Sequence, residues 1–212
     1  MVGIPLTKCM DGADLLRLVE ELAVVESLFG AEAAQHPARK WEYSMALRAG
    51  KGLNGSGIYP HVALDVGGAG SPLVHMLTRA GYSTHVVDPK VNRDLAAAVA
   101  EGVQADFVTC ISVIEHVEDL MQFIWELQQV VRSGGRLFLT CDIWGQDETA
   151  KDTAHFHEMR QRIFTPKTWQ MVAEEFRNNG FEFHVGQEWE YRGEQLYGSY
   201  SFASLSLEKV KQ

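Results

Sequence analysis

The stretch from residue 61 to residue 72, His-Val-Ala-Leu-Asp-Val-Gly-Gly-Ala-Gly-Ser-Pro, constrains the fold of this chain more than any other. Its apolar run, Val62 to Leu64, is typical of a buried strand and ends in an acid, Asp65. Three glycines then permit a tight turn that a ligand can approach closely: Gly67, Gly68 and Gly70. Ser71 can cap a following helix, and Pro72 suits its first position. This order of strand, glycine turn and helix start predicts a nucleotide-cofactor site.

Composition narrows the class of protein. The chain has 212 residues, of which 46% are hydrophobic and 22% charged, as expected for one globular domain with a full-sized core. The net charge is −9 and no block of Lys or Arg occurs, so we expect no nucleic-acid partner. Three widely spaced cysteines imply no disulfide framework. We see no signal-peptide pattern and no apolar run near the roughly 20 residues of a membrane span, and expect a cytoplasmic protein without a membrane partner.

Strands and helices alternate after residue 58, which predicts an α/β fold with a doubly wound, mostly parallel sheet and helices on both faces. The expected strands cover residues 62–64, 83–87, 106–112, 136–141, 181–189 and 200–207. The expected helices cover residues 73–80, 93–100, 117–131 and 165–179. No helix separates the last two strands, so they should pair as a hairpin and make the final strand antiparallel.

Residues 1–57 are predicted to form an N-terminal helical cap, before an α/β domain over residues 58–212. Helical spacing of apolar residues indicates one helix over 11–29 and another over 38–47. The second helix carries Trp41 and Tyr43. These two side chains either close the cofactor pocket from above or simply pack the cap on the core.

The acids at the strand ends help to identify the cofactor. Asp65, Asp88 and the end of the 106–112 strand should meet at the carboxyl edge of the sheet, where a carboxylate such as Asp88 can bind ribose hydroxyls. A dinucleotide site would show Gly-x-Gly-x-x-Gly, but Leu73 takes the third glycine position. The Asp65 carboxylate would also repel pyrophosphate, whereas it suits a ligand with a cationic amino group.

From about residue 60 to its C-terminus, the chain resembles the class I S-adenosylmethionine-dependent methyltransferases that act on small molecules. The resemblance rests on Asp65-Val-Gly-Gly-Ala-Gly, on Asp88, on residues 106–119 with their specific Ile-Glu-His-Val-Glu-Asp segment, on Gly134-Gly-Arg-Leu-Phe-Leu-Thr and on the pattern from Arg162 to Phe181. It implies a Rossmann-like methyltransferase fold and S-adenosyl-L-methionine as cofactor. The glycine turn of that family holds the methionine end, and the acid after the second strand holds the ribose.

The cofactor-binding residues expected from the resemblance are Asp65, Gly67, Gly68, Gly70, Asp88, Pro89, Asp94, Cys110 and Ile111. Two departures from the family stand out. Ala69 and Ser71 replace two of the usual glycines. Residues 89–105 are also too few for the helix, third strand and acidic turn that normally meet the adenine. Asp94 either replaces that missing acid or simply begins a helix, and both readings stay open.

Methyl transfer needs an acceptor O, N or C atom in line with the sulfonium methyl, so the protein mainly aligns the reactants and excludes water. His116 follows the 106–112 strand and is our candidate catalytic base, because an ordinary histidine pKa of about 6.5 suits this role. The alternative is that His116 caps or packs the next helix. Glu115 is a second candidate, with a helix-start carboxylate as its alternative.

The polar loop over residues 142–163 is the expected wall of the substrate site, with Trp144, His155 and His157 as candidate contacts. His155, His157 and Glu158 could also be read as metal ligands, but no firm strand or helix sets their geometry, and we expect no metal. The sequence thus predicts methyl transfer to a small molecule. The alternatives are a non-catalytic methyltransferase-fold protein that binds cofactor or partners, and a nicotinamide-dependent oxidoreductase.

Overall fold

The computed structural model describes residues 7–9, 37–53, 61–143, 153–156, 159–184, 186–189 and 201–211. The α-helices are α2 (Pro37–Gly50), α3 (Pro72–Arg79), α4 (Leu95–Ala100), α5 (Leu120–Val130) and α6 (Pro166–Asn178), with 3-10 turns η2 (Pro89–Val91) and η3 (Ile114–His116). The strands are β1 (Thr7–Cys9), β2 (Val62–Val66), β3 (Ser83–Val87), β4 (Ala105–Ile111), β5 (Val131–Ile143), β6 (Thr153–Phe156), β7 (Met159–Arg162), β8 (Phe181–Phe183), β9 (Gln187–Glu188) and β10 (Ser201–Lys209). The helix expected over residues 11–29 lies outside the described residues.

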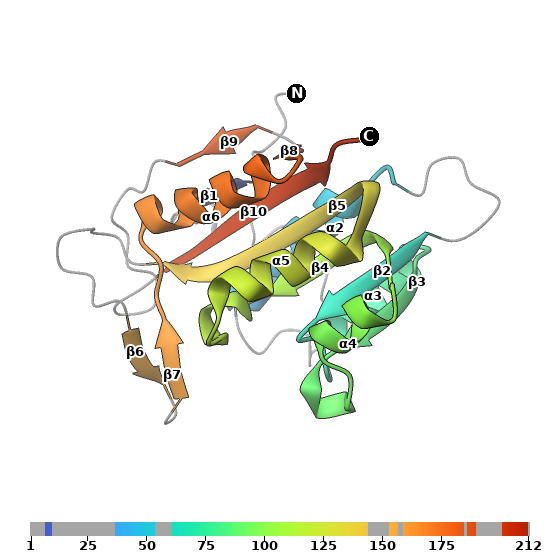
Figure 1. Ribbon diagram of the computed structural model, residues 1–212, viewed down its shortest axis with the longest axis horizontal. Coiled ribbons are helices and arrows are strands. Elements are labelled where there is room, and N and C mark those ends of the chain that lie inside the picture. The colour runs from blue at the N-terminus through green and yellow to red at the C-terminus, as the bar shows by residue number, and fades with distance from the viewer. Residues whose placement is uncertain are drawn as a thin grey trace.

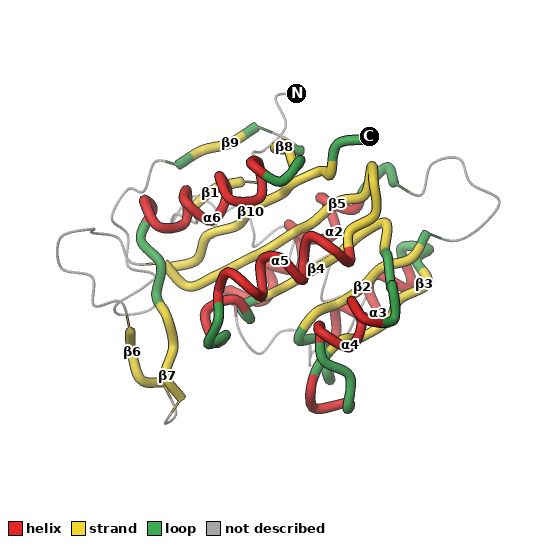
Figure 2. Tube along the Cα trace, in the orientation of Figure 1, coloured by secondary structure: helices red, strands yellow, loops and turns green. Residues whose placement is uncertain are grey.

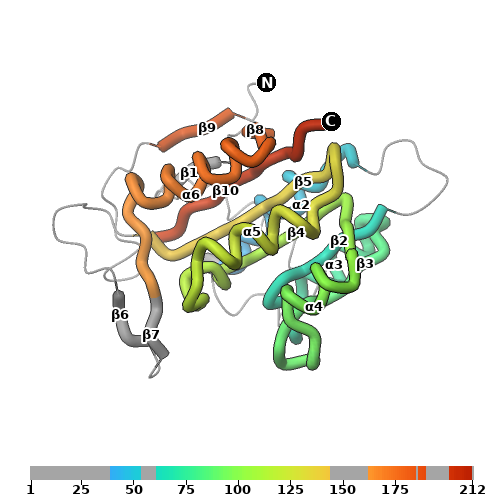
Figure 3. Tube along the Cα trace, in the orientation of Figure 1, coloured from blue at the N-terminus to red at the C-terminus, as the bar shows by residue number. Residues whose placement is uncertain are grey.

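The main sheet has the order β3-β2-β4-β5-β10-β1-β9, and β8 also pairs with β10 (Figure 1). Strands β3, β2, β4 and β5 run parallel, as predicted. Strand β10, the red C-terminal strand of Figure 3, lies antiparallel beside β5 and pairs antiparallel with β8. The expected doubly wound sheet with an antiparallel late strand is therefore confirmed.

Helices cover both faces of this sheet. The apolar sides of α4, α5 and α6 share one buried core with the sheet, whereas α2 and α3 share another on the opposite face. Figure 1 shows α5 and α6 in front of the sheet and α2 behind it. Helix α2 is thus packed directly on the strands, and the predicted domain boundary near residue 57 remains a prediction. Among the described helices, none is long and apolar enough to cross a membrane.

Strand β3 ends the sheet on one side. The segment from Asp88 to Ala105, described throughout, contains η2, α4 and an isolated bridge between Asp88 and Arg93, but no further strand of the sheet. This confirms that an element is missing after the second strand. Asp94 is the N-cap of α4, where its carboxylate accepts a hydrogen bond from Ala97 N at 2.7 Å.

Several segments differ from the sequence-based expectation. Strand β5 is longer than predicted, because the chain passes directly from α5 into the strand at Val131 and Gly134 adopts a left-handed φ of 75° within it. Residues 142–163 are not simply a loop, since β6 and β7 form an antiparallel hairpin there (Figure 2). Strand β1, which the sequence pattern did not indicate, joins the sheet beside β10.

The C-terminal end of α2 is tied to the sheet by hydrogen bonds. The buried Tyr82 hydroxyl donates to Gly50 O at 2.5 Å. Arg136 of β5 donates to Ala49 O and Lys51 O, both at 3.0 Å. These bonds satisfy carbonyls that a helix end otherwise leaves without partners, and so they fix α2 over β4 and β5.

We predict that Tyr82→Phe lowers the free energy of unfolding by about 1 to 2 kcal/mol, because the Gly50 carbonyl loses a buried donor. Urea unfolding followed by circular dichroism measures the change. Thr78→Val serves as a control, because it removes an exposed hydroxyl and should change stability by less than about 0.5 kcal/mol. Equal stability of Tyr82→Phe and wild type would contradict the prediction.

Candidate functional site

A cavity of about 240 Å³ lies at the carboxyl ends of β2 and β4. The turn after β2, the turn after β4 and helix α2 contribute its walls. Its lining residues are Arg39, Tyr43, Asp65, Val66, Gly67, Gly68, Ala69, Gly70, Ser71, Pro72, Ile111, Ser112 and Val113. Residues 65–72 form one side of this cavity, at the strand end where the sequence pattern predicts a cofactor site.

The turn after β2 depends on its glycines. Gly67 has a left-handed φ of 77°, and a Cβ there would lie 2.3 Å from Val113 Cγ2. A Cβ at Gly68 would lie 2.1 Å from Asp65 Oδ2. Both distances are far below van der Waals contact, so the turn can approach β4 and fold over Asp65 only without side chains at these positions. Ser71 then caps α3 by accepting from Leu73 N at 3.1 Å.

Asp65 is a buried acid that faces this turn, with 2% of its surface exposed. Its Oδ1 accepts from Thr109 Oγ1 at 2.7 Å, whereas Oδ2 has no hydrogen-bond partner among the described residues. Burial raises the pKa of Asp65 to about 6, against the opposing effect of the Thr109 and Ser71 hydroxyls. An incoming cation or N–H donor would satisfy the unpartnered oxygen.

Asp88 holds the neighbouring turns together at the tip of β3. Its Oδ2 accepts from Ala69 N at 3.1 Å and its Oδ1 accepts from Lys90 N at 2.8 Å. Since a carboxylate oxygen can accept more than one hydrogen bond, Asp88 retains capacity for ligand hydroxyls. The backbone bond to Ala69 also couples the position of Asp88 to the glycine turn.

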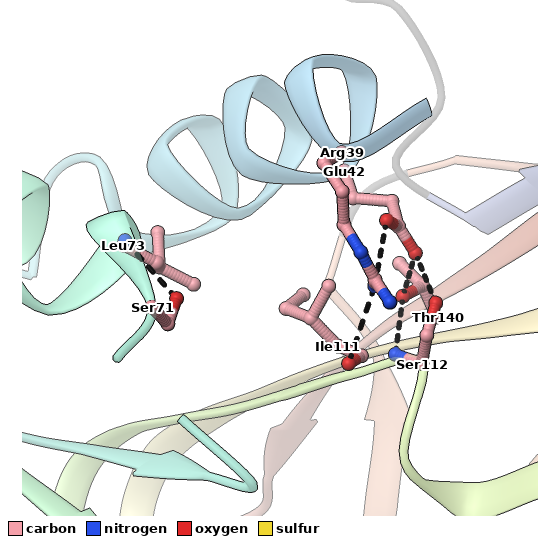
Figure 4. A network of polar contacts seen from close by, with 7 residues as sticks. All are labelled: Arg39, Glu42, Ser71, Leu73, Ile111, Ser112 and Thr140. Atoms are coloured by element: carbon pink, nitrogen blue, oxygen red, sulfur yellow. Dashed lines mark hydrogen bonds and ion pairs between the residues drawn. The ribbon is translucent and has the colours of Figure 1, made fainter. Parts of the chain in front are cut away.

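Helix α2 contributes a cluster of charged and polar side chains to the site (Figure 4). Arg39 and Tyr43 line the cavity, while Glu42 between them is fully buried. Arg39 Nη1 donates to Glu42 Oε2 at 3.0 Å. Glu42 Oε1 accepts from Ser112 Oγ at 2.7 Å and from Thr140 Oγ1 at 2.5 Å. The Glu42 carboxylate therefore joins α2 to the ends of β4 and β5.

Ser112 adopts a left-handed backbone with a φ of 48°, which is uncommon for a residue other than glycine. Its backbone N–H donates to Thr140 Oγ1 at 3.1 Å, and its hydroxyl donates to Glu42. These contacts hold the strained residue in place. The turn brings Ile111, Ser112 and Val113 to the cavity wall directly before η3.

Turn η3 carries the two candidate catalytic residues. Glu115 is buried, with 1% of its surface exposed, and neither carboxylate oxygen has a partner from another described residue. His116 is exposed, and partial burial together with the charge of Arg39 lowers the pKa of His116 below its ordinary value of 6.5. A neutral imidazole at physiological pH can accept a proton.

The other predicted site residues are distributed as follows. Ile111 lines the cavity, whereas Cys110 is fully buried in the core, and burial raises the pKa of its thiol well above the usual value. Pro89 and Asp94 are exposed on the segment after β3. His155 lies in β6 in register with Arg160 of β7, and Trp144 and His157 lie outside the described residues.

Sequence reasoning missed Arg39 and Glu42. On a helix, a pair of opposite charges three residues apart is normally read as a solvated ion pair, and nothing in the pattern placed it against the sheet. The available signal was the Arg39, Glu42 and Tyr43 spacing, which puts all three on one helix face. Of the two aromatic residues considered, Tyr43 lines the cavity, whereas Trp41 packs in the core.

Residues 31–194 match a family model described as a methyltransferase domain. No curated protein matches the sequence. Among solved structures, 1,6-didemethyltoxoflavin-N1-methyltransferase from Burkholderia thailandensis, with 1,6-didemethyltoxoflavin and S-adenosylhomocysteine bound, is 17% identical, with a TM-score of 0.55 and coverage of 99% of this chain and 94% of that chain. Geranyl diphosphate C-methyltransferase from Streptomyces coelicolor A3(2) is 14% identical (TM-score 0.54), with 96% and 90% covered. The [4+2]-cyclase SpnF is 13% identical (TM-score 0.54), with 81% and 83% covered. These similarities show a shared fold.

We predict that Asp65 makes the protein less stable as pH rises. Its pKa is about 6 in the folded chain against 3.8 for an ordinary aspartate, so the folded state binds the proton more tightly. The free energy of unfolding should therefore fall as pH rises through this window and level off above it. Relative to wild type, Asp65→Asn should gain about 2 to 3 kcal/mol between about pH 3 and pH 8.

Urea unfolding over this pH range measures the difference between the two proteins. Asp94→Asn is the matched control, since it changes an exposed helix cap at which asparagine serves as well as aspartate. A stability difference between Asp65→Asn and wild type that is independent of pH would contradict the assignment.

Proposed function

We propose that this chain, which belongs to the methyltransferase-domain family, transfers the methyl group of S-adenosylmethionine to an O, N or C atom of a small molecule. The resemblance drawn from the glycine turn and the Ile-Glu-His-Val-Glu-Asp segment agrees with the family match. One observation carries the proposal furthest. A buried acid with an unpartnered oxygen and a guanidinium meet at one cavity beside a glycine turn.

These charges fit the amino-acid end of the cofactor. The Asp65 Oδ2 atom can accept from the ammonium group, and the Arg39 guanidinium can bind the carboxylate. Asp88, at the tip of the next strand, would accept the ribose hydroxyls. The absence of side chains at Gly67 and Gly68 keeps the turn compact around this end. The segment from Asp88 to Ala105 supplies no further strand beside this site.

The bound cofactor supplies an activated sulfonium methyl group. The chain's own part is to hold the acceptor in line with that group, to exclude water and, where the acceptor is a hydroxyl, to remove its proton. His116 is the proposed base, because its lowered pKa keeps the imidazole neutral near physiological pH. The hairpin of β6 and β7, whose second strand contacts η3, would form the substrate wall.

The family match favours catalysis over a purely structural or partner-binding role. The match also disfavours a nicotinamide-dependent oxidoreductase. The sequence had already argued against that activity, because Leu73 replaces the third glycine of a dinucleotide turn and the Asp65 carboxylate would repel pyrophosphate. Fold alone would not decide between these roles, since the same fold occurs in a [4+2]-cyclase. A cytoplasmic location and the absence of a nucleic-acid partner stay predictions from composition.

We predict that wild-type protein binds S-adenosylhomocysteine in titration calorimetry and that Arg39→Met weakens this binding at least about tenfold, because the ligand carboxylate loses a charge-assisted partner. Arg79→Met is the control, since Arg79 is exposed on α3 away from the cavity. Asp88→Ala should also reduce the affinity. Absence of binding by the wild type would overturn the proposed cofactor.

We predict that His116→Ala lowers turnover on an oxygen acceptor by about 10²-fold while affinity for S-adenosylhomocysteine is kept. A methylation assay over a panel of phenols and alcohols, with radiolabelled cofactor, measures this rate. The wild-type rate should decline on the acid side with a midpoint below 6.5, and the variant should lose this dependence. His75→Ala, an exposed change on α3, should keep the wild-type profile. An unchanged rate in His116→Ala would leave His116 a structural residue.

A further inference from the structure

Three buried acids lie together beneath α2, next to the cofactor cavity. Glu42 comes from α2, Glu115 from η3 and Asp142 from the end of β5, and they are 0%, 1% and 6% exposed. Glu115 interacts electrostatically with the other two acids and with Arg39. The Arg39 guanidinium also acts on Glu115 and opposes the effect of these acids. The strongest charge acting on Glu115 is therefore that of another acid, Asp142.

Glu42 has a complete set of partners within the fold. Arg39 donates to one of its oxygens, and the Ser112 and Thr140 hydroxyls donate to the other. Glu115 differs, because both of its oxygens are buried without a partner from another described residue. The fold thus explains why Glu42 is an acid, and it does not explain why Glu115 is one.

A buried, unpartnered carboxylate is costly, and it becomes stable only when it is protonated or meets a cation. Burial, and next the charge of Asp142, raise the pKa of Glu115 well above its usual value. Folded structures seldom leave both oxygens of a buried acid unused, and each such group calls for an explanation. An N–H donor with a positive charge would satisfy both oxygens through charge-assisted hydrogen bonds.

The position of Glu115 indicates which molecule could supply that cation. The cofactor cavity is lined in part by Ile111, Ser112 and Val113. Glu115 lies directly after them, in turn η3. Turn η3 also contacts β5 and β7. After β7, the chain meets the end of β5 again, where Phe164 N donates a hydrogen bond to Asp142 O at 3.1 Å. The acids therefore lie at the ends of β4 and β5, close to β7 and next to the residues that line the cofactor cavity.

We propose that Glu115, assisted by Asp142, forms the subsite that binds a protonated nitrogen group of the methyl acceptor. The ligand class is an ammonium, amidinium or guanidinium compound. This inference rests on the proposed methyl transfer and narrows its substrate class. It concerns the group that anchors the acceptor, and the atom that receives the methyl group is left unassigned.

The test compares molecules of equal shape that differ in charge. Protein saturated with S-adenosylhomocysteine is titrated with benzylamine and benzyl alcohol, and in a second pair with tyramine and tyrosol. Wild type should bind each amine at least about tenfold more tightly than its alcohol. Glu115→Gln should abolish this preference. Glu118→Gln, a change at an exposed acid three residues later, should retain it.

Binding of S-adenosylhomocysteine reports on the fold of each variant. If wild type binds S-adenosylhomocysteine but shows no preference for either amine, the acidic subsite is disproved while the proposed function stands. If wild type does not bind S-adenosylhomocysteine, the proposed function itself fails. Should Glu115→Gln not fold, Asp142→Asn replaces it, with at least about a threefold loss of the amine preference expected. A full preference in a folded Glu115→Gln protein would overturn the inference.

Discussion

The Glu42 carboxylate links helix α2 to the carboxyl ends of β4 and β5. It accepts from Ser112 and Thr140 on the sheet and from Arg39 on its own helix. Together with the hydrogen bonds at the C-terminal end of α2, this link positions Arg39 and Tyr43 at the cavity. The cavity is therefore made by two segments far apart in the sequence, and a buried acid, rather than apolar contact alone, sets how they meet.

Burial of charge is the common feature of the site. Asp65 and Glu115 are both nearly inaccessible, and both have raised pKa values because the protein interior disfavours the ionised form. Such groups reduce stability, and proteins concentrate them at functional sites. Asp65 lies in β2 directly before the glycine turn, and Glu115 lies in η3 directly after β4.

The sequence predicted those strands, turns and helices whose residue pattern matches the position that they take in the folded protein. The strand before Asp65, the glycine turn and the acid at Asp88 follow from spacing along the chain. The missing third strand follows from comparing the short segment after Asp88 with the family that the sequence resembles. Glu42 could not be found in this way, because a polar residue on a helix is usually solvated and only tertiary packing buries it. Strand β1 was also missed, since three residues carry too little periodicity to indicate a strand.

The left-handed backbone of Ser112 has a consequence for how distant substitutions should be interpreted. This conformation disfavours the folded chain by about 1 kcal/mol or more and persists because α2 and β5 both hold the residue. Docking of the helix and the shape of the β4 end are thus thermodynamically linked. A substitution at Phe138 or Phe202, in the apolar contact between α2 and the sheet, would then affect ligand recognition without touching a ligand. In this protein, a loss of affinity is not by itself a sign that a residue lies in the binding site.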